Sequence, residues 1–116
     1  MKVGVTAEGD TLGSYVADDF GHAPYFLLVD TDTLDYTVVK NEFTEAAGAG
    51  FKVAKALVGL GLGAVLVGGI GMHGMKILND AGIRVVSDVE GTAEEVVTEF
   101  RDRLALEAKF ADKGKA

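Results

Sequence analysis

The apolar residues of this chain alternate with a period of two in some segments and recur with a period near 3.6 in others. Alternating or continuous short apolar runs are typical of strands, and amphipathic spacing at i, i+3 and i+4 is typical of helices. On this basis we predict five strands, at residues 2–7, 25–30, 36–40, 64–67 and 83–87. We predict three helices, at 51–59, at 72–81 and from residue 93 to about residue 107. The order is β-β-β-α-β-α-β-α.

Local signals at the ends of the predicted helices support these boundaries. Gly82 is placed to end the second helix in a left-handed conformation. Thr92 and Glu95 have the spacing of a capping box at the start of the third helix. In the first helix we expect one apolar face to point into the core, made of Phe51, Ala54, Leu57 and Val58.

This order of elements predicts an α/β fold. Strands joined by short connections pair as antiparallel neighbours, whereas strands reached through a helix lie parallel through right-handed crossovers. We therefore expect a mixed five-stranded sheet with helices packed on its faces. Residues 1–107 form a single predicted domain, and we expect the tail at 108–116 to fray.

Composition narrows the possible functions. The 116 residues carry 11 Lys+Arg and 18 Asp+Glu, a net charge of −7, which argues against binding to nucleic acid or to an anionic membrane. No cysteine is present, so thiolate metal sites and cysteine nucleophiles are excluded. No apolar run approaches the ~20 residues needed to cross a bilayer, and no secretory leader is evident, so we expect a cytoplasmic protein.

Glycine-rich turns are the main candidates for a site. The strand at 64–67 runs into Gly68-Gly69-Ile70-Gly71 and then into a helix that contains His73. A strand that ends in glycines before a helix leaves backbone amides open to an anion. His22 follows Gly21 in the irregular stretch at 8–24, and Gly48-Ala49-Gly50 opens another helix. Each feature also has a simpler interpretation, in which His22 is an exposed loop residue and the glycines only permit tight turns.

Two enzymatic interpretations are weak. The spacing G-x-G-x-x-G occurs at 69–74, but three other strands precede it, so a dinucleotide fold fits poorly. A two-metal nuclease needs a carboxylate in the middle of its first strand, and Val3-Gly4-Val5-Thr6 has none. No nucleophile–base pair is evident either. We therefore expect that the protein is not an enzyme.

Several motifs together resemble a known family. They are KVGVTA at 2–7, FGHAPYF at 20–26, GAG at 48–50, GLGAVLVGGIG at 61–71 and ILNDAGIRVV at 77–86. They resemble the dinitrogenase iron–molybdenum cofactor biosynthesis family of small accessory and carrier proteins. The resemblance implies a three-layer ribonuclease-H-like α/β fold without nuclease chemistry. It also implies binding or delivery of iron–sulfur clusters, including precursors of the nitrogenase cofactor.

The chain departs from this family's pattern at two places. Asp19 stands before Phe-Gly, where family members often have a basic residue or histidine. Gly71-Met72-His73-Gly74 stands where Gly-Pro-Asn/Gly-Ala is common, and it adds a potential ligand. In the implied topology the loops after the first and fourth strands leave the same end of the sheet, so His22 and His73 are expected to converge.

The hypothesis that follows is a non-enzymatic carrier of an iron–sulfur cluster or an iron–molybdenum cofactor precursor. Its partners would be that cargo and a protein that donates or accepts the cluster. His22 and His73 are the expected metal ligands. The alternative is a regulatory module that binds a small anion or a protein without metal. The predicted site comprises Phe20, Gly21, His22, Gly48, Gly50, Gly69, Gly71, Met72, His73 and Gly74.

Overall fold

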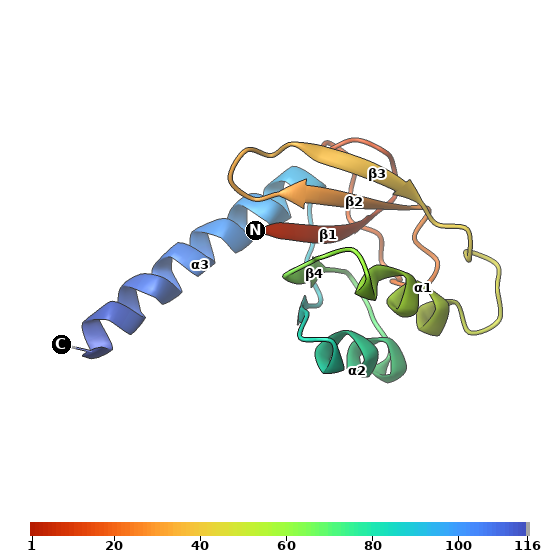
Figure 1. The fold of residues 1–116 in the computed structure, drawn as a ribbon. Coiled ribbons are helices and arrows are strands. Elements are labelled where there is room, and N and C mark those ends of the chain that lie inside the picture. The colour runs from red at the N-terminus through yellow and green to blue at the C-terminus, as the bar shows by residue number, and fades with distance from the viewer. Residues whose placement is uncertain (116) are drawn as a thin grey trace.

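The computed structural model describes residues 1–115, with their side chains as far as residue 111, and contains five strands and three helices (Figure 1). The strands are β1 (Lys2–Ala7), β2 (Tyr25–Asp30), β3 (Tyr36–Lys40), β4 (Ala64–Leu66) and β5 (Arg84–Val86). The helices are α1 (Ala49–Val58), α2 (Met72–Asp80) and α3 (Ala93–Lys115).

The five strands form one mixed sheet in the order β3-β2-β1-β4-β5. β1 pairs antiparallel with β2, and β2 pairs antiparallel with β3. β4 lies parallel to β1 on one side and to β5 on the other. The mixed five-stranded sheet predicted from the sequence is therefore confirmed. Because β1 and β4 are parallel neighbours, the loops that follow them leave the same end of the sheet.

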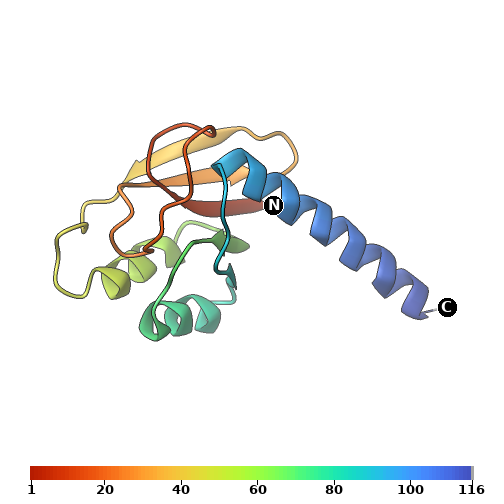
Figure 2. The ribbon, with the colours of Figure 1, turned by 180° about the vertical axis from the view of Figure 1, so that it is seen from behind.

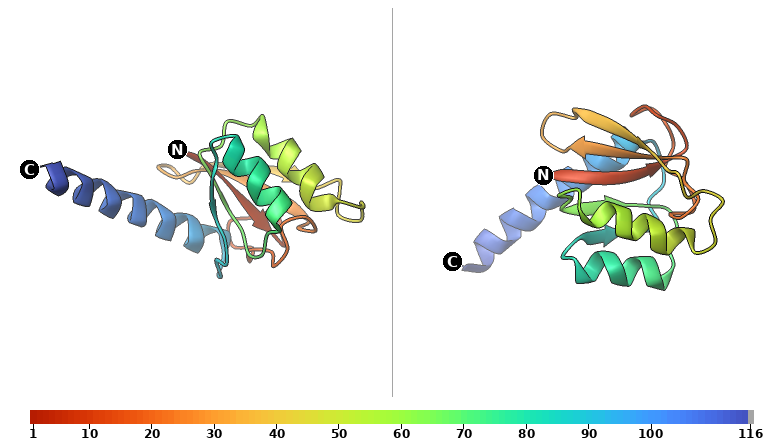
Figure 3. Two further views of the ribbon diagram at one scale, coloured as in Figure 1. Left: turned by 90° about the horizontal axis from the view of Figure 1, so that it is seen from below. Right: turned by 45° about the vertical axis from the view of Figure 1, so that its right-hand side comes forward.

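Helices cover both faces of the sheet, so the fold has three layers (Figure 3). α1 and α2 lie side by side on one face, where Val53, Leu57 and Leu78 pack into one buried cluster. α3 covers the other face, where Val97 packs with Val5 of β1 in a second cluster. Both clusters form because successive residues of a strand point to opposite faces. Burying each such valine or leucine stabilises the fold by about 1.5–3 kcal/mol.

The predicted signals at the helix ends are confirmed. Gly82 has a φ of +79°, and its N–H donates to the carbonyl of Asn79 at 2.9 Å. The N–H of Ile83 donates to the carbonyl of Leu78 at 2.9 Å, which completes a Schellman motif. At the start of α3, Glu95 accepts the N–H of Thr92 and Thr92 Oγ1 accepts the N–H of Glu95, both at 3.2 Å.

The predicted inward face of α1 is wrong at two positions. Phe51 is 51% exposed and Val58 is 40% exposed, whereas Val53 is fully buried. At 100° per residue, Phe51 lies nearly opposite Val53 on the helix, so only one of the two can face the sheet. The buried residues of α1 are Ala49, Val53, Ala54 and Leu57.

The C-terminal helix extends beyond the sheet (Figures 1 and 2). We expected residues 108–116 to fray, but α3 continues to Lys115, and residue 116 lies outside the described residues. No glycine or proline interrupts the chain between Ala93 and Lys113, and the intervening Ala, Leu, Glu and Lys are good helix formers. Within the described residues, no helix is long and apolar enough to cross a membrane.

Candidate functional site

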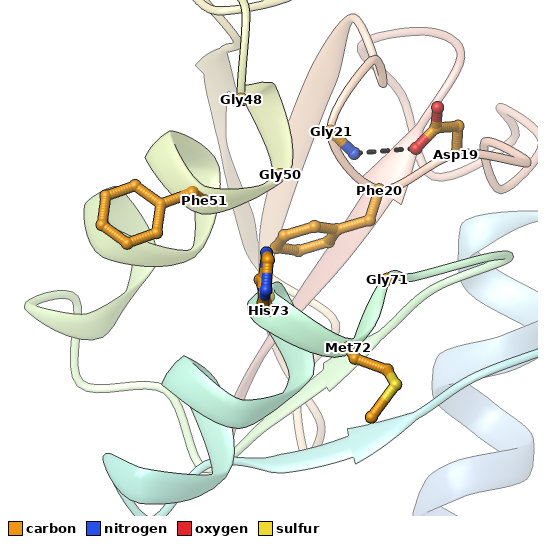
Figure 4. A pocket seen from close by; sticks show the side chains of 10 residues that line it. Asp19, Phe20, Gly21, Gly48, Gly50, Phe51, Gly71, Met72 and His73 are labelled. Atoms are coloured by element: carbon orange, nitrogen blue, oxygen red, sulfur yellow. Dashed lines mark hydrogen bonds between the residues drawn. The ribbon is translucent and has the colours of Figure 1, made fainter.

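A pocket of about 310 Å³ opens at the carboxyl ends of β1 and β4 (Figure 4). Three segments form its walls: the loop after β1, the start of α1 and the start of α2. The lining residues are Asp19, Phe20, Gly21, Gly48, Gly50, Phe51, Gly71, Met72, His73 and Gly74.

The loops after β1 and β4 are in direct contact, and this contact forms one side of the pocket. The N–H of Phe20 donates to the carbonyl of Gly69 at 2.9 Å, and the N–H of Gly69 donates to the carbonyl of Asp18 at 2.5 Å. A Cβ at Gly68 would lie 2.5 Å from the carbonyl oxygen of Ala17. Glycine therefore permits an approach between the two loops that any side chain would prevent.

Two helix N-termini point toward the same pocket. α1 begins after Gly48, which has a φ of +70°, and α2 begins after Gly71; neither helix has a side-chain cap or an acidic residue in its first turn. The first hydrogen bonds of the two helices run from Lys52 N–H to Gly48 and from Met75 N–H to Gly71, both at 3.1 Å. The N–H groups of residues 49–51 and 72–74 therefore have no partner within their helices. Such ends carry partial positive charge and favour an anion.

The walls of the pocket are packed closely behind this opening. A Cβ at Gly21 would lie 2.7 Å from the backbone nitrogen of Gly50. A Cβ at Gly74 would lie 3.4 Å from the ring of Phe20 and 3.5 Å from the carbonyl oxygen of Gly50. The loop after β1 and the start of α1 are therefore in tight backbone contact at Gly21, and a Cβ at Gly74 of α2 would lie within van der Waals distance of both.

The side chains at the pocket are mainly apolar or neutral. Phe20 is 1% exposed and forms the floor, whereas Phe51 is 51% exposed and Met72 is 88% exposed. Figure 4 shows Phe51 on the α1 side of the pocket and Met72 on the opposite side, and Phe20 and His73 line the pocket between them. An aromatic ring, an imidazole and a thioether thus lie near helix N-termini whose first amides have no partner within their helices.

Asp19 is the charged residue of the lining, and its carboxylate is used by its own loop. Asp19 Oδ1 accepts the N–H of Gly21 at 3.1 Å, and Oδ2 lies 2.5 Å from Nδ1 of His22 (Figure 4 shows the first bond). The side chain of His22 is 58% exposed and does not line the pocket. Of the two histidines expected to converge, only His73 lines the pocket.

The other predicted site residues line the pocket, except Gly69. Gly69 instead joins the two loops behind it. Phe51 also lines the pocket, although the apolar face of the predicted helix placed its side chain in the core. The sequence did contain an indication of this, because Phe51 directly follows Gly48-Ala49-Gly50. Residues in the first turn of a helix that begins at a site lie beside that site. Among residues 1–111, no group of three His, Cys, Asp or Glu side chains is placed to hold a metal ion.

The fold and the pocket together define a structural class, namely small three-layer α/β domains with a pocket at the carboxyl ends of two parallel strands. The chain belongs to the dinitrogenase iron-molybdenum cofactor family, whose model matches residues 1–103. The family predicted from the sequence motifs is therefore confirmed. Membership gives the protein a metallocluster-related role.

Solved structures with similar folds agree with this assignment. The apo form of the orange protein from Desulfovibrio gigas is 36% identical, with a TM-score of 0.81 over 87% of each chain. A putative NifB protein from Thermotoga is 32% identical, with a TM-score of 0.74 over 87% of each chain. Among curated protein sequences, none matches this chain.

Proposed function

We propose that this protein is a non-enzymatic carrier that binds an iron–sulfur cluster or an iron–molybdenum cofactor precursor and delivers it to another protein. The observation that carries the proposal is the meeting of two uncapped helix N-termini at one pocket, with no acidic residue in either first turn. The six amides at 49–51 and 72–74 would offset the negative charge of such a cargo. Family membership supports the same assignment.

His73 is the residue best placed to ligate iron in the cargo. It lines the pocket in the first turn of α2, and imidazole is an ordinary ligand of iron. The thioether of Met72, on the same turn, suits a soft metal. His22 remains a predicted ligand, but its Nδ1 is paired with Asp19, so it would ligate through Nε2 or after that bond opens. Because no thiolate is present, affinity should be modest, as a carrier requires.

Delivery needs a second protein that donates or accepts the cluster. The exposed side chains of Phe51 and Met72 lie beside the pocket and offer apolar contact area to that protein. The ribonuclease-H-like fold implied by the family resemblance is part of this proposal. This fold is compatible with a non-enzymatic role, because β1 lacks the carboxylate that a two-metal nuclease needs in the middle of its first strand.

The test is anaerobic incubation of the metal-free protein with ferrous iron and sulfide, followed by desalting. We expect bound iron and a charge-transfer absorbance in the visible range, both much reduced in His73→Ala. His22→Ala is compared with His73→Ala and should retain more iron, because His22 does not line the pocket. If the wild-type protein binds no iron, the carrier proposal is wrong; if the His22→Ala/His73→Ala double variant binds as much as wild type, the ligand assignment is wrong.

A second candidate is a regulatory module that binds a small anion or a protein without metal. It is favoured by the lack, among residues 1–111, of three side chains grouped to hold a metal ion. Its test is a titration of metal-free protein with inorganic phosphate, followed by amide NMR. Shifts at residues 49–51 and 72–74, in a protein that takes up no iron, would support this candidate over the carrier.

A further inference from the structure

Asn41 lies outside the pocket but holds the loop that forms one of its walls. The residue directly follows β3 and is 4% exposed. Its side-chain Nδ2 donates to the carbonyl of Gly21 at 3.0 Å and to the carbonyl of Ala23 at 2.8 Å. Its Oδ1 accepts the N–H of Phe43 at 2.8 Å, and its own N–H donates to the carbonyl of Pro24 at 2.9 Å.

Three of these four hydrogen bonds need the side-chain amide of asparagine, and the fourth is donated by its backbone N–H. The NH₂ group supplies two donors to two carbonyl oxygens, and the carbonyl oxygen of the side chain accepts one N–H. An aspartate has the same shape, but it would place a carboxylate oxygen against the carbonyls of Gly21 and Ala23. Two buried acceptors would then lose their donor, and the new oxygen would repel them.

The position of Gly21 matters because it packs on the N-terminus of α1. A Cβ at Gly21 would lie 2.7 Å from the nitrogen of Gly50 and 3.1 Å from its Cα, so the two backbones are already in contact. Asn41 therefore connects the 19–23 loop to the segment that leads from β3 into α1. Gly21 is thus hydrogen-bonded to Asn41 on one side and packed on the first turn of α1 on the other.

We propose that Asn41 is a positioning residue, which sets the separation between the 19–23 loop and the first turn of α1 and thereby the affinity of the pocket. The effect of Asn41 on affinity rests on the proposed carrier function. The effect of Asn41 on the separation of the walls does not depend on that function, because it is a property of the metal-free protein. The two can be tested separately.

The experiment compares Asn41→Asp with wild type in two measurements. The first records the amide NMR resonances of Gly21 and Gly50 in metal-free protein. The second titrates ferrous iron with sulfide anaerobically, at a temperature where circular dichroism shows every variant to be folded. We expect both resonances to shift and the affinity for iron to fall about tenfold, because two buried hydrogen bonds are lost.

Two control variants separate positioning from stability and charge. Asn79→Asp makes the same chemical change at an exposed position of α2. Leu104→Ala removes a partly buried side chain that packs on the opposite face of the sheet, so it lowers stability without touching the pocket. Both should bind iron as wild type does. If Leu104→Ala loses as much affinity as Asn41→Asp, the role of Asn41 is only structural and the proposal is wrong.

The remaining outcomes are also decisive. Unchanged resonances of Gly21 and Gly50 in Asn41→Asp would refute the positioning role. If wild type takes up no iron, the carrier function fails, and the resonances alone then decide the role of Asn41. If Asn41→Asp does not fold, Asn41→Ser replaces it, since the hydroxyl keeps one donor and should give smaller changes in the same direction.

Discussion

Replacement of Gly21 by alanine tests whether the pocket walls are held by direct backbone contact. The new Cβ would lie 2.7 Å from the nitrogen of Gly50, 3.1 Å from its Cα and 3.2 Å from the carbonyl carbon of Ala49. All three atoms belong to the backbone of α1, so no side chain can rotate away. Either the 19–23 loop or the first turn of α1 must move.

The expected cost follows from this overlap. Adding a methyl group to a well-packed region typically destabilises a protein by about 1–3 kcal/mol. That is a large share of the roughly 5–15 kcal/mol by which a domain of this size is stable. With a urea m-value of about 1–3 kcal/mol/M, the unfolding midpoint should fall by roughly 1 M.

Urea unfolding followed by circular dichroism measures this effect, and Gly50→Ala is the matched control. A Cβ at Gly50 meets nothing within 4 Å, and Gly50 lies inside α1. Alanine there should leave stability unchanged or raise it by up to about 1 kcal/mol, because alanine is the better helix former. Equal unfolding midpoints for the two variants would refute the claim that Gly21 and α1 are in contact.

Three further predictions concern the scaffold. Thr92→Ala should destabilise the protein by about 1 kcal/mol in urea unfolding, because it removes the hydroxyl of the capping box with Glu95. Gly82→Ala should cost a similar ~1 kcal/mol in thermal unfolding, because its φ of +79° strains any residue with a Cβ, although the space around it is open. The Arg84 guanidinium donates two hydrogen bonds of 3.0 Å to the Glu107 carboxylate and lowers the pKa of that carboxyl below its usual range. The pair therefore stabilises the fold fully at pH values above the usual pKa range of a glutamate carboxyl. This contribution is lost as the pH falls through the lowered pKa. Glu107→Gln should therefore lower stability at pH 7 but not in acid, and a loss that persists unchanged in acid would contradict this account.

Much of the scaffold followed from local patterns. The five strands, the three helices, the Gly82 cap and the Thr92–Glu95 capping box were all predictable, because each depends on residues close together in sequence. The antiparallel and parallel pairings followed from the lengths of the connections. The motifs at 20–26, 48–50 and 61–71 were enough to identify the family.

The composition of the pocket was harder to predict. Its glycines, Phe20, Met72 and His73 were expected, because glycine turns after parallel strands meet at one end of a sheet. Phe51 was assigned to the core, since periodicity alone does not say which side of α1 faces the sheet. Asn41 was not identified at all, because its hydrogen bonds cross 18 and 20 residues of sequence.

The sequence by itself determined the elements, the mixed sheet and the family, because apolar periodicity, capping residues and glycine turns act over short distances along the chain. Only the tertiary structure decided which of the two histidines lines the pocket. It also placed Phe51 at the pocket and Asn41 in hydrogen bonds with the loop that forms one of its walls. Those outcomes depend on contacts between segments far apart in sequence. The glycine-rich turn at 68–74 shows both: its presence is visible in the sequence, and its close fit against Ala17 and Asp18 exists only in the folded chain.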